Sequence, residues 1–392
     1  MNTSDALPSW ADYLATLGDA DAVLAALADP SDPLQRQEAF KLLFMSVAAG
    51  YQSTFTDADH PDFVPAVSNI LNSVGTNPDF IYASAKVDGT GQYRLSGERG
   101  EGLFLMFDFA AGGLSVTEEF GPSTGTLDID KFTLRDGKFD ILLSAQRPAG
   151  YDGDWYELDP TTLGCVMRQA SYDWGAEREA RIAIERLDTP VRTTPMTPEE
   201  MARRMQLLAA FPRRYAGFAL GYCKGQRDRG LVNALEHDDW AGRGGLDGQH
   251  YYQGIFRLEP GTALVLETEL PERVRYWNVQ LNDSYWNSID WFNHQSSLNG
   301  GQAMIDPDGK FRAVIALEDP GIPNWLDPAG HSEGSLMLRW TEASSGPAPT
   351  LKLVPLAELD QHLHAQTPRV SSQAREEQVR ERRRGAQLRR RW

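Results

Sequence analysis

Apolar residues recur every three or four positions near the start of the chain. The pattern runs from Trp10 to about Tyr51, and Pro30 and Pro33 interrupt it. This spacing predicts two amphipathic helices, because residues three and four apart share one helix face, with a break at the prolines. The apolar positions are Leu14, Leu17, Val23, Leu24, Leu27, Phe40, Leu42, Leu43, Phe44 and Val47. We expect these faces to cover another element.

From Ile81 the period changes from three or four residues to two. Short segments alternate or run apolar, and Gly, Asp and Pro turns separate them. The segments are IYASAKVD, QYRLSGER, LFLMFDFA, LSVTEEF, KFDILLSA, CVMRQASYDW and ARIAIERL. Because no helix intervenes, they predict an antiparallel sandwich or jelly roll rather than a βαβ fold.

A helical region follows the first set of strands. Thr197 is a good cap, Pro198 suits the first helical position, and two glutamates follow. Pro212 is expected to break or kink this helix, and a second helical stretch reaches about Tyr222. The helical pair is therefore expected to divide two β domains.

Strand patterns resume at Tyr251. The segments are YYQGIFRL, ALVLETEL, YWNVQLND, FRAVIALE, SLMLRW and TLKLVPL. After Pro355 the chain becomes charged, which predicts a helix that packs through Leu356, Leu359 and Leu363 and keeps its Arg-rich end in solvent. No internal repeat of 20–50 residues is visible, although the two β regions could still be related in shape.

These patterns predict a mainly β protein with helical additions. We expect two antiparallel, jelly-roll-like β-sandwich domains, N-terminal helices, a central helical connector and a C-terminal helix. The predicted boundaries are 1–60 for the N-terminal helices, 61–190 for the first sandwich, 191–232 for the connector, 233–356 for the second sandwich and 357–392 for the charged helix.

Charge and hydropathy narrow the class of protein. The formal charge of -17 argues against a general nucleic-acid binder, because phosphate contacts need a basic face. No apolar run is long enough for a transmembrane helix, and the first residues lack the basic and apolar regions of a secretory signal. We therefore expect a cytoplasmic protein, in which Cys165 and Cys223 are reduced, buried thiols.

The common catalytic signatures are missing from the sequence. It contains no P-loop, H-E-x-x-H or C-x-x-C motif, and no G-x-S-x-G nucleophile elbow, since GPSTG and GHSEG do not stand between a strand and a helix. Its Gly-x-x-Gly and Gly-x-Gly pairs also lie in turns rather than between a strand and a helix. A Ser-His-Asp triad assembled across the fold stays open, without local support.

The loop before the strand SLMLRW concentrates polar chemistry. His331 and Glu333 stand between glycines, and Asp327 precedes them. The histidine could act as a base whose ring the carboxylate orients, or both residues could bind a metal. They could also only form hydrogen bonds with the loop backbone. His294 and His250 could reach the same pocket, but no ligand pair has a recognised metal spacing, so no cofactor is predicted.

Acidic and aromatic residues crowd the second β region. The acids are Asp283, Asp290, Asp319 and Asp327, and the rings are Tyr276, Trp277, Tyr285, Trp286, Trp291, Phe292, Trp325 and Trp340. Rings beside paired acids suit a sugar or another ring substrate. The plainer interpretation is that tryptophans fill the core and acids cap turns. Trp286 and Trp291 lie in a polar stretch and are the better pocket candidates.

The first β region offers a second group of polar candidates. A turn presents Asn77 and Asp79 just before the strand that carries Tyr82. Arg168 lies on an otherwise apolar strand, and a strand arginine in that setting needs an acidic partner or an anionic ligand. An internal salt bridge is the simpler of these two interpretations.

Several of these segments together resemble a bacterial family named domain of unknown function 1214, whose longer relatives carry domain of unknown function 1254. The resemblance covers residues 70–345, and NWLDPAGHSEG is its most specific segment, while VSSQAREEQVRERRR resembles the terminal helix of the family. The other matching segments are GTNPDFIYASAKVDGTGQYRLSGERG, SAQRPAGYDGDWYELDPTTLGCVMRQASYDWGAEREARIAIERL and the run from RYWNVQLNDSYW to LMLRW. The resemblance implies two jelly-roll-like sandwiches and supplies no catalytic residues.

The sequence thus favours a hydrolase or lyase that acts on a ring-containing small molecule, such as a glycoside or an apolar alcohol or ester. His331 is the expected acid or base, oriented by Glu333 or Asp327, with Asp290 or Asp283 as second carboxylate. The substrate is expected to contact Trp286, Trp291, His294, Asn324, Trp325, Asn77, Asp79, Tyr82 and Arg168. The alternatives are a non-catalytic sandwich that binds a carbohydrate or lipophile, and a structural or assembly role. Partners other than a small-molecule substrate are limited to a second copy of the chain in a homo-oligomer.

Overall fold

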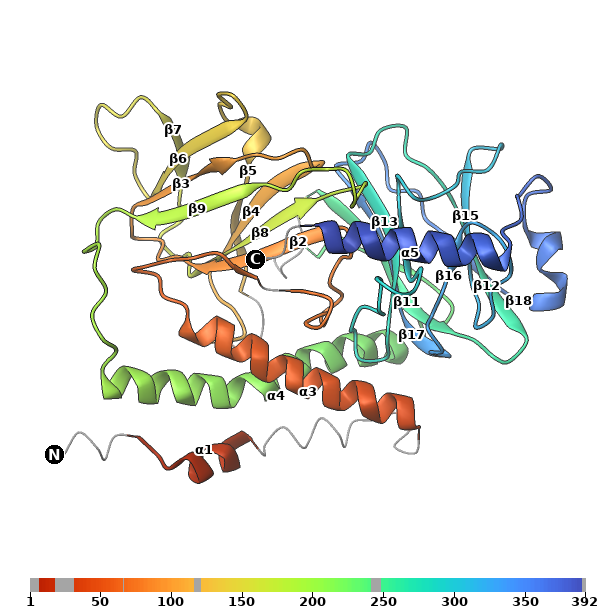
Figure 1. Cartoon of the computed structure of the whole chain (residues 1–392), viewed down its shortest axis with the longest axis horizontal. Helices are drawn as coiled ribbons and strands as arrows, with labels where there is room; N and C mark the ends of the chain where they lie inside the picture. Colours follow the sequence, from red (N-terminus) through yellow and green to blue (C-terminus); the bar gives the residue numbers. More distant parts are fainter. Residues whose placement is uncertain (1–6, 18–31, 66, 116–120, 241–247, 390–392) are drawn as a thin grey trace.

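The computed structural model describes residues 7–17, 32–65, 67–115, 121–240 and 248–389. Two β-sandwiches lie side by side, two long helices run along one side of them, and the C-terminal helix crosses a second side (Figure 1). The predicted fold class is therefore confirmed.

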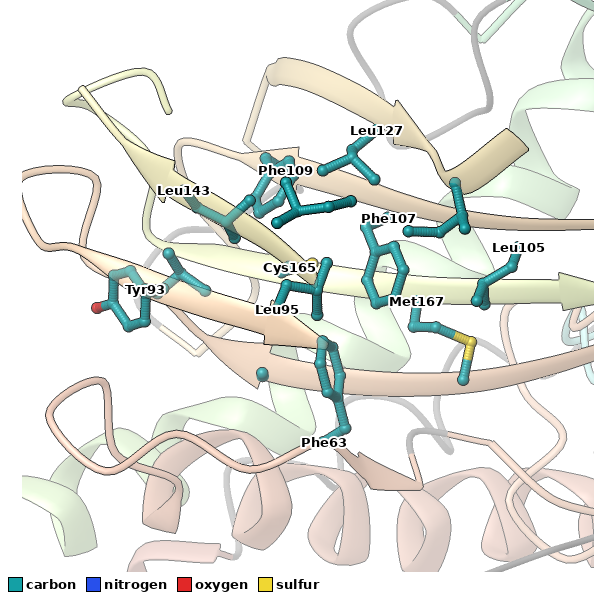
Figure 2. Close-up of a cluster of buried hydrophobic side chains, with 14 of the residues drawn as sticks. Phe63, Tyr93, Leu95, Leu105, Phe107, Phe109, Leu127, Leu143, Cys165 and Met167 are labelled. Carbon is teal, nitrogen blue, oxygen red and sulfur yellow. The ribbon is translucent and has the colours of Figure 1, made fainter. Parts of the chain in front are cut away.

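The first sandwich consists of two packed sheets, with strand orders β1-β2-β8-β4-β5 and β7-β6-β3-β9. Its strands are β1 (Val64–Pro65), β2 (Phe80–Lys86), β3 (Tyr93–Glu98), β4 (Phe104–Ala110), β5 (Ser123–Asp128), β6 (Lys138–Ser144), β7 (Asp154–Glu157), β8 (Gly164–Ala170) and β9 (Arg181–Arg186). A short 3-10 helix, η3 (Ile129–Lys131), follows β5. Alternate residues of each strand, such as Leu105, Phe107 and Phe109 of β4, point into a closed apolar core (Figure 2).

The second sandwich has strand orders β10-β11-β17-β13-β14 and β16-β15-β12-β18. Its strands are β10 (Glu236–Asp238), β11 (Gln249–Arg257), β12 (Thr262–Glu269), β13 (Tyr276–Asn282), β14 (Ser297–Asn299), β15 (Lys310–Ile315), β16 (Trp325–Leu326), β17 (Glu333–Thr341) and β18 (Thr350–Pro355). Its core includes Trp277 and Trp340, as the alternation of apolar residues on β13 and β17 predicts.

The two sandwiches share one topology. Strands β1 to β9 correspond in chain order to strands β10 to β18, and each strand occupies the same place in its sheet. Parallel strand pairing corresponds as well, since β6 pairs with β7 and β15 pairs with β16. The fold is therefore a duplicated sandwich, although the sequence shows no visible repeat.

Helices α3 (Pro33–Phe55) and α4 (Pro198–Asp228) pack against each other and cover the outer face of the sheet that contains β11. Thr197 caps α4 as predicted, because its hydroxyl accepts a hydrogen bond from the backbone N–H of Glu200 at 3.2 Å. The expected break at Pro212 is absent, because α4 continues through this buried proline. A short helix, α1 (Trp10–Thr16), precedes them. The predicted helical positions Leu17 to Leu27 lie almost entirely outside the described residues.

The C-terminal part corrects one expectation. Leu356, Leu359 and Leu363 do pack on the second sandwich, from the short helix η4 (Leu356–His362) and the residue after it. Helix α5 (Ser372–Leu388), however, packs through arginines rather than keeping them all in solvent. Arg375 and Arg382, seven residues apart on one helix face, lie over the rings of Trp325 and Trp174, 5.3 and 4.5 Å from the ring centroids.

Cys165 and Cys223 are buried free thiols, as predicted. No helix within the described residues is both long enough and apolar enough to cross a membrane.

Candidate functional site

The outer faces of the two five-stranded sheets meet where the sandwiches join. On β2, Ala83 points into the first core, whereas Phe80 and Tyr82 point outward. On β13, Trp277 points into the second core, and Tyr276 points outward. Phe80 and Tyr276 then contact each other across the junction, with ring centroids 5.1 Å apart. Strand alternation therefore places outward side chains of both sandwiches in one buried layer.

Asp79 is the hub of this layer. Its Oδ1 accepts hydrogen bonds from Trp174 Nε1 at 2.9 Å and Asn299 Nδ2 at 2.6 Å. Its Oδ2 accepts a hydrogen bond from the Tyr276 hydroxyl at 2.6 Å, and its backbone N–H donates to Asn77 Oδ1 at 3.0 Å. Burial raises the pKa of Asp79, and the bonds from Tyr276 and Asn299 oppose that rise. These residues fasten the two sandwiches together.

Tyr82 and Arg168 form a cation–aromatic pair on the first sandwich. They are cross-strand neighbours, and the guanidinium carbon of Arg168 lies 6.0 Å from the Tyr82 ring centroid. The Tyr82 hydroxyl accepts a hydrogen bond from the backbone N–H of Asn77 at 3.2 Å. Burial raises the pKa of Tyr82, although the charges of Arg168 and Arg339 lower it. Arg168 forms an ion pair with Asp108, the internal salt bridge that the sequence favoured.

Arg339 occupies the same layer from the second sandwich. Its Nη1 donates hydrogen bonds to Gln280 Oε1 at 2.6 Å and Asn278 Oδ1 at 3.3 Å. Its Nη2 donates to the Gly75 carbonyl at 3.0 Å. The guanidinium carbon lies 5.6 Å from the ring centroid of Tyr251, its cross-strand neighbour on β11.

A cavity of about 130 Å³ adjoins this layer and includes Tyr82 in its wall. Aromatic residues from both sandwiches line it: Phe80 and Trp174 from the first, and Trp291 and Phe292 from the second. Helix α5 contributes Ala386. An engineered apolar cavity of about 150 Å³ binds benzene, so this cavity has the size and lining for one small ring.

A solved structure of an uncharacterized protein from Burkholderia cenocepacia has this architecture. It matches with a TM-score of 0.83 and 30% sequence identity, over 89% of this chain and 97% of that chain. This chain belongs to the same family. A protein from Vibrio parahaemolyticus covers 79% of this chain and 97% of its own, with 11% identity and a TM-score of 0.45. No family model and no curated protein matches the chain.

In this family member the structure brings part of the predicted site together. Asn77, Asp79, Tyr82 and Arg168 lie in the layer between the sandwiches, and Trp291 lines the cavity beside Tyr82. The layer joins segments that are far apart in the sequence. Asp79 and its hydrogen-bond partner Asn299, for example, are 220 residues apart.

The predicted acids and histidines lie elsewhere, and their pairing differs from the expectation. Asp327 contacts His294 rather than His331, with its Oδ2 at 2.7 Å from His294 Nδ1. This contact raises the pKa of His294. Glu333 forms ion pairs with Arg227 and Arg257 at 2.7 and 2.5 Å. Two arginines hold the Glu333 carboxylate, so the expectation that it orients His331 is wrong.

The charged groups that act on His331 include Asp32, Glu38 and Lys41, at the start of α3. Burial lowers the pKa of this histidine, and the negative charge of Glu38 on α3 opposes this effect. The same Glu38 acts on Asp283, whose pKa rises to about 7, chiefly because of burial. Within the described residues, the His331 ring makes no hydrogen bond to Glu333 or Asp327. Acid–base groups therefore gather here, but without the expected dyad.

Four more of the predicted site residues have partners within the protein. Trp286 stacks on Tyr222 at 3.8 Å between centroids, beneath α4. Trp325 Nε1 donates to the Ala316 carbonyl at 2.9 Å, and Asn324 Nδ2 donates to the Met304 and Arg312 carbonyls at 2.6 and 2.8 Å. Similarly, Asp290 accepts hydrogen bonds from the backbone N–H groups of Phe292 and Asn293 and from Asn293 Nδ2. The expectation that Trp286, Trp291 and Trp325 form the walls of one pocket is wrong, because only Trp291 lines the cavity.

Sequence reasoning missed Arg339, Tyr251 and Asn299, and it listed Tyr276 among the aromatic residues without assigning it a contact. Arg339 carries the same signal as Arg168, an arginine on an apolar strand, in SLMLRW. Asn299 gave no local signal, and nothing in the sequence linked Tyr276 to Asp79, because both bonds join residues of different sandwiches. In the part of the chain that the structure describes, no group of three or more His, Cys, Asp or Glu residues could hold a metal ion.

Proposed function

We propose that this chain is an enzyme, a hydrolase or lyase, that acts on a ring-containing small molecule held in the cavity between the sandwiches. The observation that carries the proposal is the composition of the cavity wall. Four aromatic rings, Phe80, Trp174, Trp291 and Phe292, surround a space for one ring, and the phenol of Tyr82 borders it.

Tyr82 is the proposed hydrogen-bond and proton donor. Burial raises its pKa, so the hydroxyl stays protonated at neutral pH and can donate to a substrate oxygen that gains negative charge. The Asn77 N–H fixes the position of the phenol oxygen. The nearby charges of Arg168 and Arg339 stabilise negative charge on that oxygen during proton transfer.

The Tyr82→Phe variant tests this role. It keeps the ring in the cavity wall but removes the donor, so turnover is expected to fall by about 100-fold or more, the usual loss for one such donor. Wild-type protein is first tested for turnover of a panel of single-ring esters, glycosides and alcohols. The variant is then compared with wild type on the compound that wild type converts fastest. Tyr51→Phe is the matched control, because Tyr51 is 58% exposed on α3. Full turnover by a folded Tyr82→Phe variant would refute the proposal.

A second candidate function is binding of an apolar ring without chemistry. It is favoured by the mostly apolar lining of the cavity and by the internal hydrogen bonds that already occupy both carboxylate oxygens of the adjacent Asp79. Saturable binding of a ring probe, without turnover of any member of the panel, would select this function.

We also propose that the family of this chain is domain of unknown function 1214. The segment NWLDPAGHSEG supports this, and it supplies β16 and the start of β17. The two free thiols support the cytoplasm as the proposed compartment.

A further inference from the structure

Helix α3, which runs along one side of the molecule, is apolar on two faces (Figure 1). One face, which includes Ala39 and Leu42, packs in the core that α3 shares with α4 and the second sandwich. The other face exposes four large apolar side chains, here called the α3 stripe: Phe40, Phe44, Val47 and Tyr51. The sequence predicted that apolar faces in this region cover another element, and the structure leaves this face exposed.

The α3 stripe lies in an uncharged part of the helix. From Leu42 to Phe55 the chain contains no charged residue. A surface helix normally carries charged side chains on its outer face, and a helix that is apolar all round is normally buried. Phe44, at the middle of the stripe, is nevertheless 72% exposed. A contiguous apolar patch of this kind marks an interaction surface.

An open groove of about 500 Å³ lies at one end of the stripe. Its wall is mostly apolar and is formed by α3 and by the chain before β2: Phe40, Lys41, Phe44, Ile70 and Leu71. The groove has room for an aromatic side chain. The other end of the stripe carries Tyr51, whose exposed ring stacks on Phe55 with centroids 4.6 Å apart. One end of the stripe is therefore hollow, and the other end projects.

The spacing of the stripe is symmetric. Its residues are separated by four, three and four positions, the spacing of the a and d residues at a helix–helix seam. If two copies of α3 pair antiparallel about a two-fold axis, Phe44 of one copy lies opposite Val47 of the other, so a large side chain meets a small one. Phe40 lies opposite Tyr51, which brings each projecting ring to the groove of the other copy. The stripe is thus complementary to itself, as a two-fold dimer requires.

We propose that the α3 stripe is the interface of a homodimer, in which two copies of α3 pair antiparallel and each Tyr51 enters the groove of the other copy. Each copy has a formal charge of -17, so a contact between copies has to avoid charged faces, and the stripe does so. Large apolar side chains at these exposures, with Ile70, supply roughly 500 Å² on each copy, so the dimer buries about 1,000 Å², the lower limit for a specific interface. The proposal does not depend on the proposed function.

Sedimentation equilibrium of the full chain tests the interface. Wild type is expected to be a dimer at micromolar concentration. Phe44→Glu is expected to raise the dissociation constant by about 100-fold or more, because a symmetric interface loses this central ring twice. Val191→Glu is the matched control, since Val191 is 88% exposed and lies outside α3. Tyr51→Phe keeps its ring, so it is also expected to stay dimeric.

Cross-linking of single-cysteine variants tests the antiparallel pairing. At a rise of about 1.5 Å per residue, the two copies of residue 47 lie about 5 Å apart along the helix axis, and the two copies of residue 37 about 25 Å apart. A short bifunctional maleimide is therefore expected to link Val47→Cys into a covalent dimer and to leave Gln37→Cys unlinked. Wild type supplies the background, because its two native thiols are buried.

Each other result would overturn the proposal. A monomeric wild type would do so, and a loss of stability in its Phe44→Glu variant would assign the stripe to residues 18–31 of the same chain. A dimer that survives Phe44→Glu would place the interface elsewhere, and equal dissociation by Val191→Glu would show a general effect of charge. Equal cross-linking at residues 37 and 47 would contradict the antiparallel pairing. If Phe44→Glu does not fold, as judged by circular dichroism, a failure of Val47→Cys to cross-link would still refute the interface.

Discussion

The Asp79→Ala variant is expected to lose about 5 kcal/mol of unfolding free energy. The substitution leaves three buried donors, Trp174 Nε1, Asn299 Nδ2 and the Tyr276 hydroxyl, without their shared acceptor. Each buried unsatisfied donor costs about 1–3 kcal/mol. Because these donors come from both sandwiches, we also expect wild type to unfold in one transition and the variant in two.

Asp79→Asn is the control for this loss. The amide oxygen can still accept the bonds from Trp174 and Asn299, and the Tyr276 hydroxyl can donate to Asn77 Oδ1, which lies 3.0 Å away. The amide also avoids burying a charge, which is the cause of the raised pKa of Asp79. Asn is therefore expected to keep most of the stability. Calorimetry and urea unfolding measure both effects, and equal stability of the Ala variant and wild type would contradict the hub role.

Periodicity in the sequence predicts the strands and helices of this protein well, because local alternation of residues decides which face is buried. It does not reveal the duplication, since the two sandwiches share backbone topology rather than residues. The equivalence of Arg168 on β8 and Arg339 on β17, each opposite a tyrosine, appears only when the register of both sheets is known.

The candidate site, too, could be predicted from the sequence only in part. Arg168 was identified because an arginine on an apolar strand needs a counter-charge or a ligand, and that argument applies equally to Arg339. His331 and Glu333 were selected because they are close in sequence, yet on β17 and the loop before it their side chains meet different partners. Arg227 and Arg257, which hold Glu333, come from α4 and β11. The prediction for helix α5 failed for a related reason. An Arg-rich segment suggests exposure to solvent, but Arg382 packs on the ring of Trp174 and donates a hydrogen bond to the Trp291 carbonyl.

Asp283 gives the protein a predictable dependence of stability on pH. It is 2% exposed, and burial together with the charge of Glu38 raises its pKa to about 7. In the unfolded chain an aspartate has a pKa of about 3.9. Below about pH 4 the group is protonated in both states and has no effect. As pH rises toward 7, the unfolded chain releases the proton first, so the native state loses stability, by about 4 kcal/mol in all.

The Asp283→Asn variant is expected to remove this loss. Its oxygen can accept the hydrogen bonds that Tyr285 and Asn287 donate from their backbone N–H groups, both at 2.8 Å. Its new amide would face the Asn287 amide, which now donates to Asp283 at 2.7 Å. A flip of Asn287 resolves that conflict, because its Oδ1 is buried without a partner. The variant should therefore fold, and its advantage over wild type should grow from near zero at pH 4 to about 4 kcal/mol at pH 8.

Urea unfolding at intervals between pH 4 and pH 8 measures this difference. Asp290→Asn is the matched control, because Asp290 accepts a similar set of hydrogen bonds from Phe292 and Asn293 but is only half-buried. Its stability is expected to follow the wild-type pH dependence in parallel. If Asp283→Asn also runs parallel to wild type, then Asp283 is not the group whose deprotonation destabilises the native state. A steeper loss in the variant at high pH would instead show that the charged carboxylate stabilises the turn and that its hydrogen bonds outweigh its desolvation.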